Sequence, residues 1–314
     1  MPFFGPIMFV LLMFFLLNAG SYAQKVLEEF RSHPKWKLID LGEECGFSFS
    51  DRIIGGKQAA LGQYPWIVRL GYATNDEGNV VGIYECGGAI ISPRYVLTAA
   101  HCSTDHMRKN LLEVRIGEHY TESDPDCVDG ECAPRVQDIG VEEESCHLNY
   151  LGHEEFSNDI CLLRLQEPIV FSDFVQPICL PVFNNIIEHN FEGEYLEVAG
   201  WGHFSMGTES IFGSHTLLTV SVPVQSNVFC TEKYRGHTEI FSTQMCAGGE
   251  PGKDSCSGDS GGPLMKPFSI NTSTRYFLIG IVSVGPKKCG VDPIPGIYTS
   301  VAKYITWILD NVYE

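Results

Sequence analysis

The sequence lacks several features that mark other classes of protein. Its one strongly apolar run, "IMFVLLMFFLL" at 7–17, is too short to span a bilayer, and no later run approaches spanning length. No C-x-x-C pair occurs among the 12 cysteines, which argues against a zinc site. Basic residues are scarce, since 21 Lys and Arg stand against 39 Asp and Glu, a net charge of −18. This balance disfavours nucleic acid and anionic membranes as partners.

The N-terminus does contain the pattern of a secretory signal peptide. Small residues follow the apolar run, and Ser21 and Ala23 have the spacing of an A-x-A cleavage site. The stretch before the run has no Lys or Arg, so an uncleaved membrane anchor is the alternative. We expect residues 1–23 to be a signal peptide and the protein to be secreted and extracellular. In that setting the even number of cysteines predicts six disulfides.

The pattern between residue 53 and about residue 300 predicts an all-β barrel or sandwich. Short apolar-alternating runs such as "PWIVRLGY", "DICLLRL" and "YFLIGIVSVG" are separated by Gly, Pro, Asn and Asp. Only the end differs, because from Ser300, a candidate N-cap, apolar side chains share one helical face. These are Val301, Ile305, Ile308, Leu309 and Val312. Residues 24–44 are charged and cysteine-free, and we expect an extended or disordered arm there.

The strongest chemical signal is "GDSGGP", residues 258–263. A serine is a poor nucleophile unless a base takes its proton and donors hold the resulting oxyanion. The glycines allow a tight turn in which the N–H groups of Gly258 and Ser260 point at one oxygen. His101 in "LTAAHC" is a candidate base, and Asp159, which opens an apolar strand in "NDICLLRL", can orient it. Either residue alone would normally be structural, but the three contexts together favour nucleophilic catalysis.

From Arg52 to the C-terminus the chain resembles the chymotrypsin-like (trypsin-fold) serine peptidases, through "IIGG", "LTAAHC", "NDICLLRL", "GDSGGP" and "PGIYTSV". The resemblance implies an all-β fold of two packed six-stranded antiparallel β-barrels, with the cleft between them and a C-terminal α-helix. It implies that Ser260 is the nucleophile and that His101 is the general base and then the acid. Asp159 would hold the imidazole tautomer, and Gly258 and Ser260 would supply the oxyanion hole.

The stretch "DRIIGGKQAA", residues 51–60, places a trypsin-cleavable Arg52 before Ile53. Taken alone, it is equally typical of a surface loop before a first strand. The resemblance implies instead that cleavage after Arg52 frees the α-ammonium of Ile53, which turns inward and pairs with Asp259. The intact chain would then be a zymogen. Residues 24–52 would be the activation peptide or light chain, and residues 53–314 the peptidase domain.

The resemblance also implies the specificity and the disulfides. Asp254 matches the carboxylate at the pocket floor of trypsin-like members, and such a carboxylate calls for Arg or Lys before the scissile bond. Ser283, Gly285 and Gly296 match other substrate-binding positions. Val284 stands where the family usually has an aromatic residue, so no subsite preference beyond Arg or Lys is implied. The implied disulfides are Cys45–Cys179, Cys86–Cys102, Cys127–Cys132, Cys146–Cys161, Cys230–Cys246 and Cys256–Cys289.

Two stretches, "DPDCVDGECAPRVQDIGVEEE" and "GPKKCGVDPIPGIYTSV", are similar to the catalytic domains of arthropod clip-domain proteases. Those proteases act in extracellular cascades that lead to Toll signalling or melanisation, a part of innate immunity. A clip domain needs six cysteines and residues 24–52 contain one, so the resemblance is to a clip-type catalytic domain without its clip.

Two modification or ligand sites are also predicted. The sequon Asn271-Thr272-Ser273 lies between apolar runs, as expected for an exposed hairpin tip and a glycosylation acceptor. Residues 118–144 hold ten acidic residues against one Arg135. A solvated acidic loop is the plainer interpretation of this segment. The resemblance suggests instead a structural calcium ion at Glu118, closed by one of Glu142 to Glu144. No cofactor is required for catalysis.

The implied function is therefore a secreted serine endopeptidase zymogen that performs limited proteolysis in an extracellular cascade. Its expected partners are protein substrates cleaved after Arg or Lys, an upstream activating protease and serpin-type inhibitors, without nucleic acid or membrane. The alternatives are a non-catalytic homologue acting as a binding cofactor, and a digestive or venom trypsin. Non-catalytic homologues usually lose a member of the triad, and all three members are present here.

Overall fold

The computed structural model describes residues 23–42, 44–49, 57–73, 83–107, 109–152, 155–183, 185–202, 213–251, 255–256, 258–286 and 293–314. Strands dominate these ranges. They are β1 (Lys57–Gln58), β2 (Ile67–Tyr72), β3 (Ile83–Ile90), β4 (Tyr95–Thr98), β5 (Leu111–Ile116), β6 (Cys127–Val128), β7 (Glu131–Cys132), β8 (Gln137–Cys146), β9 (Cys161–Leu165), β10 (Tyr195–Gly200), β11 (Leu218–Gln225), β12 (Gln244–Gly248), β13 (Pro263–Ile270), β14 (Ser273–Val284) and β15 (Pro295–Ser300).

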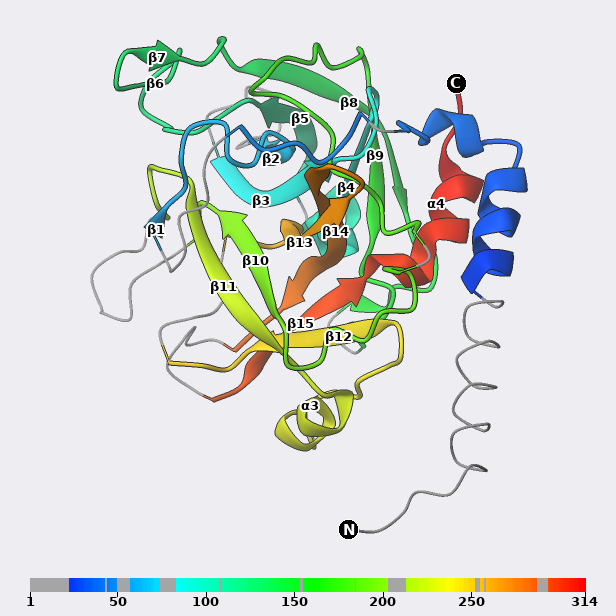
Figure 1. Ribbon diagram of the computed structural model, residues 1–314. Coiled ribbons are helices and arrows are strands. Elements are labelled where there is room, and N and C mark those ends of the chain that lie inside the picture. The colour runs from blue at the N-terminus through cyan, green and yellow to red at the C-terminus, as the bar shows by residue number, and fades with distance from the viewer. Residues whose placement is uncertain are drawn as a thin grey trace, which may run out of the picture.

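The strands form two antiparallel barrels that lie side by side (Figure 1). The first closes in the order β2-β3-β4-β9-β8-β5. The second runs β11-β10-β13-β14-β15-β12 and closes because β11 pairs with both β10 and β12, while β1 extends the edge at β11. Two six-stranded antiparallel barrels were expected, and the structure confirms them.

One buried hydrophobic cluster includes residues of both barrels, such as Leu70 of β2 and Leu278 of β14. Every residue of β4 and of β9 is buried, as expected for strands without a solvated face. Trp66, just before β2, is fully buried, and its indole Nε1 donates to the sulfur of Met265 in β13 at 2.9 Å. This contact joins the first barrel to the second.

The predicted C-terminal helix is present as a 3-10 turn, η4 (Val301–Tyr304), that continues into α4 (Ile305–Asn311). The apolar face inferred from sequence is buried, with Val301, Ile305 and Ile308 each 0% exposed. Ser300 occupies the N-cap position of η4, but its side chain makes no capping hydrogen bond. The shorter helices are η1 (Trp36–Leu38), η2 (Ala100–Cys102), α2 (Thr104–Met107) and α3 (Asn227–Lys233).

The expectation of an extended or disordered arm at residues 24–44 is wrong. Residues 23–32 are helical, and η1 follows. The charged residues that suggested disorder, such as Glu28 and Glu29, occupy the exposed face of this helix, while Leu27 and Phe30 are buried on the other face. An i, i+3 pair of this kind makes a short apolar stripe, which becomes stable only when a second surface covers it.

Five disulfides are present in the described residues. They are Cys45–Cys179, Cys86–Cys102, Cys127–Cys132, Cys146–Cys161 and Cys230–Cys246, the same pairs that the family resemblance implied. Cys146 and Cys161 face each other directly in the β8–β9 ladder. Cys256 is disulfide-bonded, and its expected partner Cys289 lies outside the described residues.

Several other predictions also fall outside the described residues, namely the signal peptide up to residue 22, the cleavage site at Arg52 and Ile53, and the pocket residue Asp254. Within the part of the chain that the structure describes, no helix has the length and apolarity needed to cross a membrane. The sequon does lie at a hairpin tip, because Asn271 and Thr272 join β13 to β14 and both are exposed.

Candidate active site

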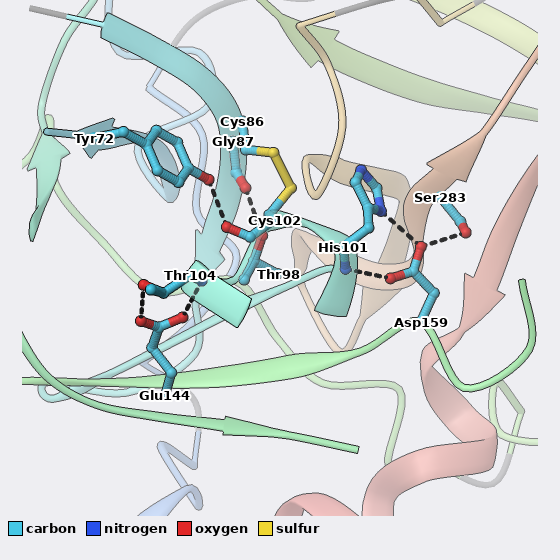
Figure 2. The surroundings of a disulfide bond; sticks show 10 residues. All are labelled: Tyr72, Cys86, Gly87, Thr98, His101, Cys102, Thr104, Glu144, Asp159 and Ser283. Carbon is cyan, nitrogen blue, oxygen red and sulfur yellow. Dashed lines mark hydrogen bonds and ion pairs between the residues drawn. A yellow bond between two sulfur atoms is a disulfide. The ribbon is translucent and has the colours of Figure 1, made fainter. Parts of the chain in front are cut away.

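The pairing of two buried strands brings His101 and Asp159 together. β4 ends at Thr98, opposite Cys161 at the start of β9. His101 follows β4 and lies in η2, and Asp159 lies two residues before Cys161, the first residue of β9. The Asp159 carboxylate, 0% exposed, accepts the His101 backbone N–H at 2.9 Å and lies 2.8 Å from the imidazole Nδ1 (Figure 2). One carboxylate thus holds both the ring and the main chain of His101.

The second barrel completes the surroundings of Asp159. The Ser283 hydroxyl, on β14, donates to Asp159 Oδ2 at 2.5 Å, and the Thr299 hydroxyl, on β15, donates to the Asp159 carbonyl at 2.8 Å. Tyr304 donates to the side-chain oxygen of Asn158 at 3.0 Å, where Asn158 has a positive φ of 58°. Ser283 was placed with the substrate-binding residues on sequence grounds. Its side chain stabilises the buried carboxylate, and its role in substrate binding stays a prediction.

The short helix that carries His101 is itself held on several sides (Figure 2). Cys102 is bonded to Cys86 in β3, and its carbonyl accepts the Tyr72 hydroxyl at 2.6 Å. The Glu144 carboxylate accepts the Thr104 backbone N–H at 2.8 Å and the Thr104 hydroxyl at 2.5 Å. The imidazole is therefore presented from a rigid support, as a group that transfers protons requires.

The electrostatics of the pair favour an ion pair when the imidazole is protonated. Burial alone lowers the pKa of His101, but the Asp159 charge and hydrogen bond outweigh it and hold the pKa above its usual value. Burial alone raises the pKa of Asp159, and the His101 charge together with three hydrogen bonds brings that pKa below its usual value. Asp159 is thus ionised at neutral pH, and His101 can accept a proton more readily than a free histidine.

Ser260 faces the same cleft as His101. The cleft has a volume of about 760 Å³, and its lining includes His101, Gly258, Ser260 and Trp201. The turn that carries Ser260 requires glycine, since Gly258 has φ of 100° and a Cβ at Gly261 would lie 2.2 Å from the Thr98 hydroxyl. The Ser260 carbonyl accepts the Gly87 N–H at 2.8 Å, which ties this second-barrel turn to β3 of the first barrel.

The neighbouring carboxylate, Asp259, packs against a glycine-rich strand end. Its two oxygens accept the backbone N–H groups of Gly202 and Cys256, each at 2.9 Å. A Cβ at Gly200 would lie 2.2 Å from Asp259 Oδ1, and one at Gly202 would lie 2.5 Å from it. These positions therefore need glycine so that the carboxylate can lie against the backbone.

The two glycines predicted for the walls of the specificity pocket differ in the space around them. A Cβ at Gly296, in β15, would lie 3.2 Å from the Tyr298 ring and 3.4 Å from the Ser255 hydroxyl. Ser255 is buried and lies 2.9 Å from the Tyr298 hydroxyl. A Cβ at Gly285 would meet open space. Asp254, the predicted floor of the pocket, is the residue before Ser255 and lies outside the described residues.

The acidic segment brings two buried carboxylates together, those of Glu118 and Asp126, and burial together with the Asp126 charge raises the pKa of Glu118. Glu118 is buried, accepts the His119 N–H at 3.1 Å and lies 3.7 Å from an Arg115 nitrogen. One of the next three carboxylates was expected to close the site. Glu142 pairs with Arg164, Glu143 accepts from Tyr313 and Glu144 accepts from Thr104. Among the described residues, the one cluster at metal-ligand spacing is Cys86, His101 and Cys102, in which the two cysteines form a disulfide. Ca²⁺ takes six to eight oxygens, and its binding at Glu118 stays a prediction.

Sequence reasoning missed Arg69 in the cleft lining. Its guanidinium lies 4.5 Å from the centre of the Tyr84 ring and 5.4 Å from that of Trp201, an arrangement that favours a cation. Burial lowers the pKa of Arg69. In sequence Arg69 is an ordinary polar position within an alternating strand, so no local signal could have identified it.

Two antiparallel barrels that hold an aspartate, a histidine and a serine at one cleft define the trypsin-like class of serine peptidases. The Trypsin family profile matches residues 53–308. CLIP domain-containing serine protease HP8 of Bombyx mori is 42% identical over 275 residues, which are 86% of this chain and 72% of that protein. Melanization protease 1 of Drosophila melanogaster is 39% identical over 284 residues, which are 88% of this chain and 69% of that protein.

A solved structure agrees with these similarities. The crystal structure of the Drosophila Grass clip serine protease of the Toll pathway superposes with a TM-score of 0.75 at 35% identity, over 88% of this chain and 77% of that chain. The protein therefore belongs to the trypsin family of serine proteases and is related to insect cascade proteases.

The His101–Asp159 pair predicts the acid limb of the pH profile. Because a general base must be neutral and the pKa of His101 is raised, kcat/KM should fall with decreasing pH around a midpoint above about 6.5, the usual histidine value. Asp159→Asn removes the charge that raises this pKa, so the midpoint should move down. Turnover should fall about 10⁴-fold, the loss seen in related serine proteases. Steady-state kinetics between pH 5 and 9 measure both effects. The exposed Asp173→Asn is the control, and a wild-type midpoint below the usual value would contradict the prediction.

Proposed function

We propose that this protein is a secreted serine endopeptidase zymogen that is activated by cleavage after Arg52. It hydrolyses peptide bonds after Arg or Lys and performs limited proteolysis in an extracellular cascade. The observation that carries the proposal is the buried Asp159 carboxylate, hydrogen-bonded to His101 at the cleft that Ser260 also lines. A binding cofactor would have no need to keep this buried charge.

The proposed reaction assigns a role to each group. Ser260 attacks the scissile carbonyl while His101 Nε2 takes its proton, and the imidazolium that forms is stabilised by Asp159. The N–H groups of Gly258 and Ser260 hold the oxyanion, for which the positive φ of Gly258 supports the required turn. His101 then gives the proton to the leaving amine. Water attacks the acyl-enzyme in the same way, with His101 taking its proton and returning it to Ser260.

The proposed activation acts through Asp259, next to the nucleophile. Cleavage after Arg52 would create a new α-ammonium at Ile53, and its insertion beside the half-buried Asp259 would form an ion pair there. Insertion would bury this pair, and breaking a buried pair costs about 3–5 kcal/mol, enough to shift the surrounding loops between an ordered and a poorly ordered state. Asp259 would affect those loops through its hydrogen bonds with the backbone of Gly202 and Cys256.

The biological setting is proposed from relatives and from sequence. The names of the similar proteins refer to melanisation and to the Toll pathway. The predicted signal peptide and the disulfides suit secretion into an oxidising compartment. Partners in that setting would be an upstream activating protease, protein substrates and serpin-type inhibitors. Asn271, at an exposed hairpin tip, is the proposed glycan acceptor.

Replacing the nucleophile tests catalysis directly. Ser260→Ala should reduce turnover of a peptide substrate about 10⁶-fold with an unchanged melting temperature, because the triad acts as a unit. The exposed Ser269→Ala in β13 is the matched control and should keep full activity. If cleaved Ser260→Ala retained a tenth of the wild-type rate, the assignment of Ser260 would be wrong.

Blocking the cut tests activation. Arg52→Gln should prevent activation by added trypsin, while the exposed Arg235→Gln should activate like wild type. Active-site titration with an organophosphonate and N-terminal sequencing, which should find a chain beginning at Ile53, measure the result. Full activity in an uncut chain would refute the zymogen mechanism.

Changing the pocket floor tests specificity. The wild-type enzyme should prefer Arg or Lys over Phe before the scissile bond by several orders of magnitude in kcat/KM. Asp254→Ser should remove most of that preference because a buried cation then lacks its counter-charge. Asp173→Ser controls for the loss of a carboxylate elsewhere. Equal kcat/KM values for Arg and Phe substrates of the wild-type enzyme would exclude the proposed specificity.

A further inference from the structure

The segment that precedes the proposed cleavage site is packed onto the peptidase domain. We call residues 24–42 and 44–49 the light-chain segment. Its C-terminal part is joined to the second barrel by main-chain hydrogen bonds, since Gly46 N–H donates to the Pro177 carbonyl and Tyr276 N–H donates to the Gly46 carbonyl, both at 2.8 Å. The Arg275 guanidinium lies 4.8 Å from the centre of the Phe47 ring. Cys45–Cys179 is therefore one of several connections at this end.

The N-terminal part of the segment adds an apolar contact. Leu27, Phe30 and Ile39 are 4%, 7% and 6% exposed and belong to the same buried cluster as Ile308 and Leu309 of α4. Figure 1 shows the helix of residues 23–32, in dark blue, lying beside α4. Ala23 is also buried, but it would leave with the predicted signal peptide and is not needed for this contact.

Polar contacts fix the segment at the end of α4. Lys35 Nζ donates to the Asp310 carbonyl at 2.6 Å, and His33 Nε2 lies 3.3 Å from the Asp310 carboxylate. Within the segment, the Trp36 indole donates to Asp40 at 2.7 Å and closes the turn after the helix. Apolar burial with a few directed polar contacts is the composition of a specific interface.

The position of the cut leaves all of these contacts in place. Arg52 lies three residues beyond Phe49, the last residue of the segment. All residues of the light-chain segment that make these contacts therefore lie before the cut. The cut needs to change only the segment after residue 49. The Phe49 N–H, at the end of the segment, donates to the carbonyl of Gly62, a residue that follows the cut, at 3.5 Å.

We propose that the light chain remains bound to the peptidase domain after activation through this non-covalent interface, independently of Cys45–Cys179. The proposal rests on the proposed cleavage after Arg52. The light-chain segment covers a surface of its own peptidase domain. This surface is formed by α4 and by residues 177–179 and 275–276. The light chain is thus a subunit of the active enzyme that covers an apolar surface of the peptidase domain.

Removing the covalent link tests the interface. Cys45→Ser with Cys179→Ser is purified, cut after Arg52 and passed through a size-exclusion column at micromolar concentration. The light chain should elute with the heavy chain. Adding Leu27→Asp should release it, whereas adding the exposed Lys25→Asp should not. Release from the cysteine variant as soon as it is cut, or equal behaviour of Leu27→Asp and Lys25→Asp, would overturn the proposal.

Hydrogen exchange gives a test that does not depend on the folding of variants. In cut wild-type protein, the backbone amides of residues 24–32 should exchange as slowly as in the uncut chain, because the docked helix stays closed. A light chain held only by its disulfide would exchange these amides at the rate of an unfolded peptide after the cut, and that result would refute the interface.

The two proposals fail separately. The cut is verified by N-terminal sequencing, and turnover of an Arg substrate is measured on the same sample. Where the native site is not cut, the recognition sequence of an unrelated protease in place of residues 50–52 supplies the cut, so the interface is still tested. A protected helix in an inactive enzyme would contradict the proposed function alone, and an unprotected helix in an active enzyme would contradict the interface alone.

Discussion

The active site is built around a negative charge that has no access to water. Asp159 is 0% exposed, and an isolated carboxylate in such a place would be strongly destabilising. Its charge is tolerated because His101 of the first barrel and Ser283 of the second both hydrogen-bond to it. The site therefore forms only when the two barrels have docked. The same docking brings the Gly87 N–H to the Ser260 carbonyl, which ties the turn of the candidate nucleophile to the first barrel.

A second carboxylate, Asp259, directly precedes Ser260 in the chain and is half-buried. Its oxygens are held by the backbone N–H groups of Gly202 and Cys256, so the carboxylate is connected to two loops at once. Asp159 orients His101, and Asp259 holds the turn that carries Ser260. A change in the partners of Asp259 would act on the serine turn without disturbing the His101–Asp159 pair, as the proposed zymogen mechanism requires.

The light-chain segment and the cleft use different parts of the molecule. The cleft is lined by residues such as His101 and Trp201, whereas the segment lies beside α4 and against residues 177 and 276 (Figure 1). The link between the two regions is the C-terminal segment, because Tyr304 hydrogen-bonds to Asn158 beside the buried carboxylate and α4 follows directly. The light-chain segment thus contacts the helix that follows Tyr304, and none of its residues is among those that line the cleft.

Strand alternation by itself predicted an all-β barrel or sandwich, and the helical period predicted the apolar face at the C-terminus. The resemblance carried by the motifs around His101, Asp159 and Ser260 implied the two six-stranded barrels and the grouping of these residues. The docking of residues 23–32 was not predictable in this way, because Leu27 and Phe30 form a short stripe whose burial depends on α4, far away in sequence.

The tertiary structure also decided which side chains surround each charge. Ser283 hydrogen-bonds to Asp159, and Glu142, Glu143 and Glu144 contact Arg164, Tyr313 and Thr104. Residue type shows which side chains can carry a charge or donate a hydrogen bond. Their partners come from strand register and barrel packing, which bring together residues more than a hundred positions apart, such as Asp159 and Ser283.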